Sequence, residues 1–262
     1  MTPKRFFAGL LLCATALPLS AEPIEFLVAY ENTEQPPYHL GNTSETPELR
    51  PGVSVEMIRS LSRFIPELQV RFRRVPWNRC LREMEAGKVD AVFNASFKPE
   101  RLKLGAYPWK DGQPDVSRRI ATLSYSLYTL KSSNLSWDGE RVLNLRGNIG
   151  TPSGYSIVDD LKKKRLPVEE AQTTRTNLLK LLHGRVAAVA AQDVTADKLL
   201  RDEASLFRDV VKLTPPLVSK PYYMMISHQF IHDHPLMAER IWDTLAQMRD
   251  EMMPALFEKY AQ

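Results

Sequence analysis

Arg101 is the residue in this sequence whose type and position point most directly to ligand binding. It follows an apolar stretch, residues 89–93, that predicts a strand, and Ser96 stands between the two. A guanidinium is permanently charged and can hold a carboxylate through two hydrogen bonds at once. The serine hydroxyl adds a neutral donor near the end of the strand. The pair predicts a carboxylate-binding site, although Arg101 beside Glu100 also fits an ordinary surface arginine.

A second polar cluster comes later in the chain, where Ser153, Gly154, Tyr155 and Ser156 precede a predicted helix. The free backbone N–H groups at the start of a helix, together with the helix dipole, favour an anion. A serine in this position can also simply cap the helix. The cluster is therefore a second candidate for contact with a negatively charged group.

Metal-binding and catalytic signatures are weak. His228, His232 and His234 in HQFIHDH do not have the spacing of an established metal-binding motif. The sequence also shows no Ser-His-Asp order, phosphate-binding loop or zinc signature. We therefore predict no metal, no cofactor and no catalytic residue, and a binding protein rather than an enzyme.

The elements that must position these residues alternate between strand and helix. Strands are predicted at 24–30, 68–72 and 89–93, with helices between them, and the same alternation recurs from 120 to about 200. Short connections of this kind predict mainly parallel sheets flanked by helices, with ligands beyond the carboxyl ends of the strands. We expect an α/β fold of two lobes hinged by two crossing strands: lobe 1 from 22–119 and 219–262, and lobe 2 from 120–218.

The start of the sequence predicts export to the periplasm. Lys4 and Arg5 precede an apolar run, residues 6–17, and small residues follow up to Ala21. The run is too short to span a bilayer and is typical of a cleaved signal peptide.

Without this signal segment, Cys80 is the only cysteine, so no disulfide forms within the chain. Removing two basic residues from 35, against 31 acidic ones, leaves a net charge of +2. That balance predicts no binding to nucleic acid and no membrane insertion.

Residues 76–108, PWNRCLREMEAGKVDAVFNASFKPERLKLGAYP, resemble the periplasmic solute-binding proteins of the amino-acid-binding type, family 3 of the extracellular solute-binding proteins. The matching positions are Trp77, the Gly87-Lys88-Val89-Asp90 turn, Ser96 and Arg101. The QPPYHL loop, the GTPSGYS turn and the YYMMISHQF segment add weaker matches. The resemblance implies the two-lobed class II fold and a protein that works as a monomer.

The resemblance also implies roles for single residues. Tyr38 and Trp77 would hold the apolar part of the ligand, and the turn at Ser153 to Ser156 would face Arg101 across the cleft. Members of the family place an acidic residue after the strand GRVAAVAA to accept the ligand's ammonium. By register that position is Gln192, and Asp193 comes one residue later. Either the register shifts by one, or the ligand lacks the usual α-ammonium.

The function implied by the resemblance is binding of a small polar solute, an amino acid or related carboxylate, by closure of the lobes. The solute would then pass to an inner-membrane ABC permease or a sensor. Lys98 departs from the family pattern, which has threonine at this position. Two alternatives stay open: a cyclohexadienyl-dehydratase-like enzyme on the same fold, and a degenerate member that binds a protein partner.

Overall fold

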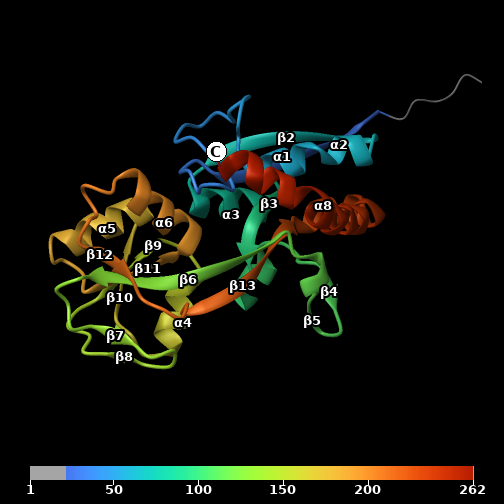
Figure 1. Ribbon diagram of the computed structural model, residues 1–262. Helices are drawn as coiled ribbons and strands as arrows, with labels where there is room; N and C mark the ends of the chain where they lie inside the picture. The colour runs from blue at the N-terminus through green and yellow to red at the C-terminus, as the bar shows by residue number, and fades with distance from the viewer. Residues whose placement is uncertain (1–21, 262) are drawn as a thin grey trace, which may run out of the picture.

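The computed structural model describes residues 22–261, so the predicted signal segment lies outside the described residues. Two α/β lobes lie side by side, and two long strands, β6 (Ala121–Leu130) and β13 (Val218–Ile226), run from one lobe to the other (Figure 1). Within the described part of the chain, no helix has the length and apolar composition needed to cross a membrane.

The first lobe is built on three parallel strands. Strand β1 lies between β2 and β3, with Ile24 opposite Leu68 and Val28 opposite Ala91. Helices that follow these strands, and the two helices at the end of the chain, cover the sheet (Figure 1). The elements are β1 (Ile24–Glu31), α1 (Val53–Arg59), α2 (Leu61–Phe64), β2 (Leu68–Val75), α3 (Trp77–Glu85), β3 (Ala91–Ser96), the 3-10 turn η1 (Pro99–Lys103), α7 (His228–Asp233) and α8 (Pro235–Ala261).

The second lobe repeats the parallel scheme, with β9 between β10 and β11. Strand β12 adds to it by pairing antiparallel with β6. Its elements are β9 (Ile149–Pro152), α4 (Ile157–Lys163), β10 (Val168–Ala171), α5 (Thr174–Leu182), β11 (Ala188–Gln192), α6 (Asp193–Asp202) and β12 (Val210–Lys212). Short hairpins project from each lobe: β4 (Trp109–Lys110) with β5 (Gln113–Pro114), followed by η2 (Val116–Arg118), and β7 (Ser136–Trp137) with β8 (Val142–Leu143).

The two crossing strands join both lobes into one sheet, in the order β10-β9-β11-β6-β13-β3-β1-β2. They pair antiparallel with each other, so that Ala121 lies opposite Tyr222 and Tyr125 opposite Val218. This order places β3 next to β13 and β11 next to β6. The carboxyl ends of β3 and β11, at Ser96 and Gln192, therefore approach the same space between the lobes.

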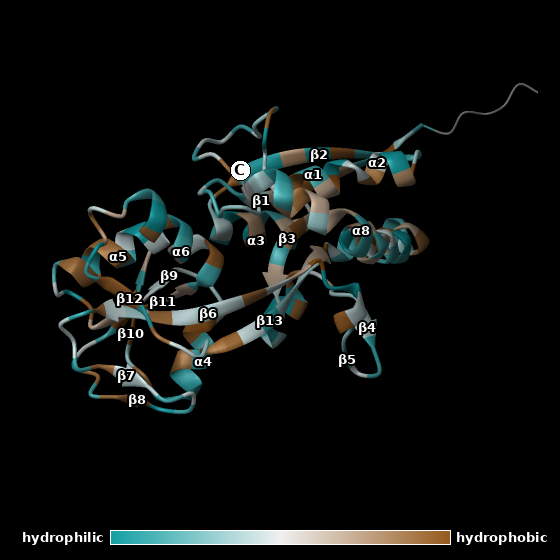
Figure 2. Ribbon diagram, viewed as in Figure 1, coloured by the Kyte–Doolittle hydropathy of each residue, from teal (hydrophilic) through white to brown (hydrophobic). Residues whose placement is uncertain are grey.

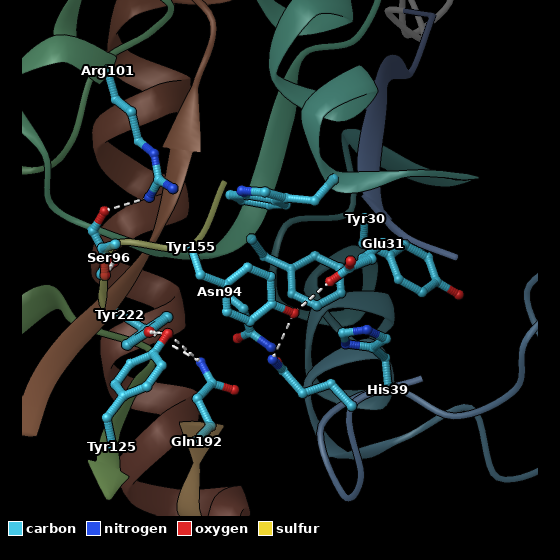
Figure 3. A pocket seen from close by; sticks show the side chains of 14 residues that line it. Tyr30, Glu31, His39, Asn94, Ser96, Arg101, Tyr125, Tyr155, Gln192 and Tyr222 are labelled. Carbon is cyan, nitrogen blue, oxygen red and sulfur yellow. Dashed lines mark hydrogen bonds between the residues drawn. The ribbon is translucent and has the colours of Figure 1, made fainter. Parts of the chain in front are cut away.

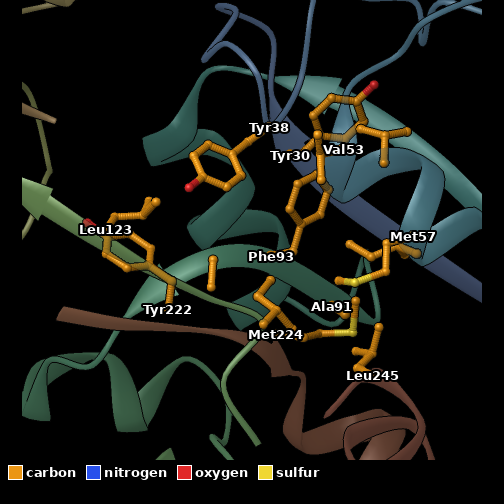
Figure 4. Packing of buried hydrophobic residues seen from close by; sticks show 14 of the residues in the cluster. Tyr30, Tyr38, Val53, Met57, Ala91, Phe93, Leu123, Tyr222, Met224 and Leu245 are labelled. Carbon is orange, nitrogen blue, oxygen red and sulfur yellow. The ribbon is translucent and has the colours of Figure 1, made fainter. Parts of the chain in front are cut away.

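The C-terminal helix α8 closes the core of the first lobe. Ile241, Leu245 and Met248 form an apolar stripe along this helix and are fully buried, and hydrophilic and hydrophobic residues alternate around it (Figure 2). Leu245 packs in the same cluster as Met224 of β13 and Met57 of α1 (Figure 4). Burying side chains of this size stabilises the fold by about 1.5–3 kcal/mol each.

Two local expectations differ from the structure. The helix expected between the first two strands is split, because α1 ends at Arg59 and Ser60 intervenes before α2. The Ser60 hydroxyl donates to the carbonyl of Glu56 at 2.9 Å, a back-bond that competes with the helical pattern. Strand β12 and both hairpins were not predicted, because strands of two or three residues show no measurable alternation.

Candidate functional site

A cavity lies between the two lobes, where the strand ends of both converge (Figure 3). Aromatic rings form much of its wall, and a few polar side chains project into it. This combination is typical of small-molecule sites. The lining residues are Tyr30, Glu31, Gln35, His39, Trp77, Phe93, Asn94, Ser96, Arg101, Tyr125, Tyr155, Ser156, Gln192 and Tyr222.

Arg101 is buried at one end of this cavity, on η1 after the end of β3. Its guanidinium carbon lies 5.2 Å from the centre of the Trp77 ring. One terminal nitrogen donates to the carbonyl of Ser96 at 2.8 Å, and the other donates to the carbonyl of Gly154 at 3.2 Å. Among the described residues, no carboxylate pairs with it. The arginine is thus oriented by neutral groups, and its charge is not neutralised by a carboxylate of the described residues.

Several side chains reach across the cleft close to Arg101. The Ser96 hydroxyl donates to the Ser156 hydroxyl at 2.7 Å, joining the first lobe to the second. Lys220 of β13 donates to the same Ser156 oxygen at 3.1 Å and also pairs with Asp160. Lys98, the departure from the family pattern, pairs with Asp159 on α4. Ser156 makes no side-chain cap to α4, because its hydroxyl is used between the lobes.

Glu31 lies on a different wall, at the end of β1. Its carboxylate accepts a hydrogen bond of 2.7 Å from the Tyr155 hydroxyl, and Gln35 donates to that hydroxyl at 3.3 Å (Figure 3). Burial raises the pKa of Glu31 to about 7, and the Tyr155 hydrogen bond opposes the rise. Burial likewise raises the pKa of Tyr155, reinforced by the nearby Glu31 charge.

His39 and Asn94 line the cavity with polar atoms that lack a protein partner. The Nε2 atom of His39 lies 2.9 Å from the carbonyl of Thr33, so this nitrogen carries the hydrogen and Nδ1 is an acceptor. Burial lowers the pKa of His39 to about 3, which keeps the ring neutral. Nδ1 of His39 and Nδ2 of Asn94 are buried without a hydrogen-bond partner. Asn94 also has a φ of 55°, a left-handed conformation that is uncommon inside a strand.

Gln192 is held by a pair of tyrosines on the crossing strands. Its Nε2 donates to the hydroxyls of Tyr125 at 3.2 Å and Tyr222 at 3.0 Å, and these two hydroxyls lie 2.7 Å apart. Burial raises the pKa of both tyrosines, and the nearby charge of Arg101 opposes the rise. The other amide atom of Gln192, Oε1, is buried without a partner. This group therefore offers a neutral acceptor on the Arg101 side of the cavity.

The structure brings together six of the predicted site residues and separates three others from the cavity. Trp77, Ser96, Arg101, Tyr155, Ser156 and Gln192 line it, whereas Tyr38, Ser153 and Asp193 do not. Tyr38 packs edge-on against Phe257 of α8, with ring centres 5.8 Å apart, because the loop after β1 turns its ring into the core. Asp193 pairs with Lys212 of β12 at 2.9 Å. Of the two neighbouring residues that were candidates for this position, Gln192 lines the cavity and Asp193 does not.

Sequence reasoning missed Tyr30, Glu31, His39 and Asn94 on the first lobe, and Tyr125 and Tyr222 on the crossing strands. Glu31 is the carboxyl end of the first strand, a position where ligands meet open α/β sheets. That rule was sufficient to select it. The two tyrosines carried no comparable signal, because only the pairing of β6 with β13 brings them together.

The histidines of the HQFIHDH segment lie apart from the cavity. His228 contacts the carbonyl of Leu102 at 2.8 Å, and His232 contacts Asp233 at 2.9 Å. Over residues 22–261, no group of three or more His, Cys, Asp or Glu side chains is arranged to hold a metal ion. These imidazoles therefore have local partners in the structure.

The raised pKa of Glu31 predicts how stability depends on pH. Its ordinary pKa of 4.5 rises to about 7 on folding, so the folded protein binds the proton more tightly. The resulting stabilisation is full below 4.5 and is lost as the pH rises through 7. We expect Glu31→Gln to be more stable than the parent by about 1–3 kcal/mol at alkaline pH and to converge with it in acid. Thermal unfolding across this pH range measures the difference.

The control is Glu25→Gln, at the exposed end of the same strand. Parallel stability curves for Glu31→Gln and the parent would show that this carboxyl titrates normally. The groups around Glu31 are the Tyr155 hydroxyl, the Cys80 thiol, and the Arg74 guanidinium that donates to the Glu31 carbonyl at 3.5 Å.

Comparison with known proteins identifies the fold. No protein-family model matches this sequence, and no curated protein matches it. Many solved structures do. A histidine kinase sensor domain with similarity to periplasmic binding proteins matches with a TM-score of 0.71 and 15% identity, over 91% of this chain and 96% of that one.

Two binding proteins match to a similar extent. One is an arginine transport system periplasmic binding protein from Legionella pneumophila, with a TM-score of 0.71 and 14% identity over 90% of this chain and 99% of that one. The other is an ancestral arginine-binding protein bound to glutamine, with a TM-score of 0.68 and 18% identity over 90% of this chain and 97% of that one. This chain therefore has the two-lobed α/β fold of the periplasmic binding proteins, as its sequence motifs predicted.

Proposed function

We propose that this protein binds a small polar solute bearing a carboxylate in the cavity between its lobes and releases it unchanged. The observation that carries the proposal is Arg101, buried in the cavity, oriented by two carbonyls and the Trp77 ring, and paired with no carboxylate of the described residues. The aromatic walls of the cavity and its few polar side chains are typical of a site for a small molecule.

Binding is coupled to closure of the lobes in this proposal. The cavity wall includes Ser96 and Arg101 from the first lobe and Tyr155 and Ser156 from the second. A ligand that contacts both lobes binds the closed form better than the open form, and so shifts the population toward closure. We place the hinge in β6 and β13, between lobe 1 (22–119 and 219–262) and lobe 2 (120–218).

We further propose that the protein acts in the periplasm as a monomer and presents its solute to an inner-membrane ABC permease or a sensor. The solved structures of similar fold include both a transport-system binding protein and a sensor domain. The partner is a membrane protein that distinguishes the closed form from the open one.

An enzymatic alternative rests on Glu31, whose pKa of about 7 is suitable for general acid–base catalysis. Among the described residues, the hydroxyl of Tyr155 is the only side-chain group that hydrogen-bonds to the Glu31 carboxylate. Recovery of the bound solute distinguishes the two functions. A binding protein returns the solute chemically unchanged, whereas a dehydratase returns a product.

The first experiment is a thermal-shift screen of the chain from Glu22 onward against amino acids, polyamines, organic acids and small peptides. A ligand present at about 100 times its Kd adds about 2.7 kcal/mol to stability, which raises the unfolding midpoint measurably. We expect stabilisation by carboxylates of the size of an amino acid. Stabilisation by polyamines alone, or by no compound in the panel, would contradict the proposal and favour a protein partner.

A further inference from the structure

The cavity has one acidic and one cationic side chain among its lining residues, and they lie on different walls. Arg101 projects from the end of β3, and Glu31 stands at the end of β1, next to Tyr155 (Figure 3). No salt bridge joins them. A ligand that satisfies both must therefore carry its negative and positive groups at separate ends.

The surroundings of Arg101 offer no carboxylate to a cation. Gln192 presents a neutral amide oxygen there, since its nitrogen is bound by the two tyrosine hydroxyls. The adjacent acid, Asp193, pairs with Lys212 and does not line the cavity. Asp159 and Asp160 are each paired with a lysine. An ammonium on the carbon next to a bound carboxylate would consequently be desolvated without an opposite charge.

The surroundings of Glu31 are suited to a cation. Besides the carboxylate, His39 offers the unpartnered acceptor Nδ1. The rings of Tyr30 and Phe93 line the same part of the cavity, with centres 5.1 Å apart, and aromatic faces attract cations. The amide of Asn94 contacts only the Ser54 hydroxyl, at 3.4 Å, and this hydroxyl can donate or accept. Asn94 can therefore turn either its oxygen or its nitrogen to a ligand.

We propose that the preferred ligand is an ω-amino acid, with its carboxylate on Arg101 and its terminal ammonium on Glu31 and His39. This inference rests on the proposed function, because it assumes that Arg101 binds the carboxylate. It extends that function by naming the ligand class. The site would select against α-amino acids, because in this arrangement their ammonium lies away from Glu31, the carboxylate among the described lining residues.

The test compares matched ligands by isothermal titration calorimetry on the chain from Glu22 onward. The ω-amino acids are γ-aminobutyrate and δ-aminovalerate. Their isomers are α-aminobutyrate and norvaline, and the acids without an ammonium are butyrate and valerate. We expect the better ω-amino acid to bind about tenfold or more tightly than its α-isomer and than the plain acid. Glu31→Gln should remove this preference, whereas Glu25→Gln should retain it.

Proton release provides a second readout that a structural role of Glu31 would not produce. An ammonium placed beside Glu31 favours its ionised form, so binding should expel the proton that the empty site retains. With a pKa of about 7, about half a proton should be released per ligand at neutral pH. Titrations in buffers of different ionisation enthalpy measure this release. Butyrate should release none, and Glu31→Gln should abolish the release by γ-aminobutyrate.

The outcomes separate this inference from the proposed function. If the α-isomers or the plain acids bind as tightly as the ω-amino acids, a carboxylate site exists and the inference about the ligand class is wrong. If the ω-amino acids bind without proton release, and equally well to Glu31→Gln, the ammonium does not lie at Glu31. If none of the carboxylates binds to the parent protein, the proposed function fails and the inference fails with it.

Discussion

Replacing Arg101 with alanine should weaken the binding of every carboxylate ligand by about a hundredfold or more, while the protein stays folded. Among the described residues that line the cavity, the guanidinium is the only cationic side chain, and its loss leaves the ligand's carboxylate desolvated without an opposite charge. Calorimetric titration of the parent and Arg101→Ala with the same ligand measures the effect. The unfolding midpoint without ligand shows whether the fold is retained.

Two further variants define what Arg101 contributes. Arg101→Lys keeps the charge but loses the planar pair of donors, so its affinity should fall between the parent and Arg101→Ala. Lys103→Ala removes a cation from the exposed part of the same turn and should bind normally. Normal binding by Arg101→Ala, with the fold intact, would show that the ligand's acid lies elsewhere.

Gln192→Glu should convert the cavity into a site for α-amino acids. The new carboxylate can accept hydrogen bonds from the hydroxyls of Tyr125 and Tyr222, which now bind the amide nitrogen of Gln192. It adds a negative charge on the Arg101 side of the cavity, where an α-ammonium would lie. We expect binding of α-aminobutyrate or norvaline to improve by about tenfold or more relative to the parent. Titration of both proteins with each isomer measures the change in preference.

The control for this change is Gln172→Glu, which adds the same charge at an exposed position of the second lobe. It should leave the preference unaltered, because the charge is screened by solvent. If Gln192→Glu loses all carboxylate binding, the new group pairs with Arg101 instead of the ligand. If α-amino acids gain nothing, Gln192 does not face the α-position.

Some features of this protein could be predicted from neighbouring residues alone. The alternation of residues 24–30 predicted β1, and the apolar residues 89–93 predicted the strand that the structure places at Ala91–Ser96. These patterns are local, because each side chain's burial follows from the period of its own strand or helix. Arg101 and Ser96 could be predicted together for the same reason. They are five positions apart in the sequence, with Ser96 at the end of β3 and Arg101 in the turn η1 that follows.

Other features depended on contacts between distant parts of the chain. Tyr38 and Trp77 are both aromatic residues near strand ends, yet Trp77 lines the cavity and Tyr38 packs on Phe257, more than 200 positions away. Ser156 follows the pattern of a helix cap, but its hydroxyl meets Ser96 of the other lobe. No local pattern distinguishes these outcomes, because the competing partner is supplied by another lobe or helix.

The amino-acid sequence by itself thus determined the order of the main strands and helices and the two-lobed α/β class, and it predicted the arginine that we propose as the carboxylate-binding residue. Only the tertiary structure decided the rest of the cavity wall. It selected Gln192 over Asp193, because Lys212 of β12 neutralises the aspartate. It also brought Glu31 to the cavity opposite Arg101, through the pairing of β1 with β3 and the approach of Tyr155 from the second lobe. Whether the charged groups of the cavity match those of a ligand depends on the distances between them across the cleft. These distances are set by how the two lobes pack, which no local sequence pattern encodes.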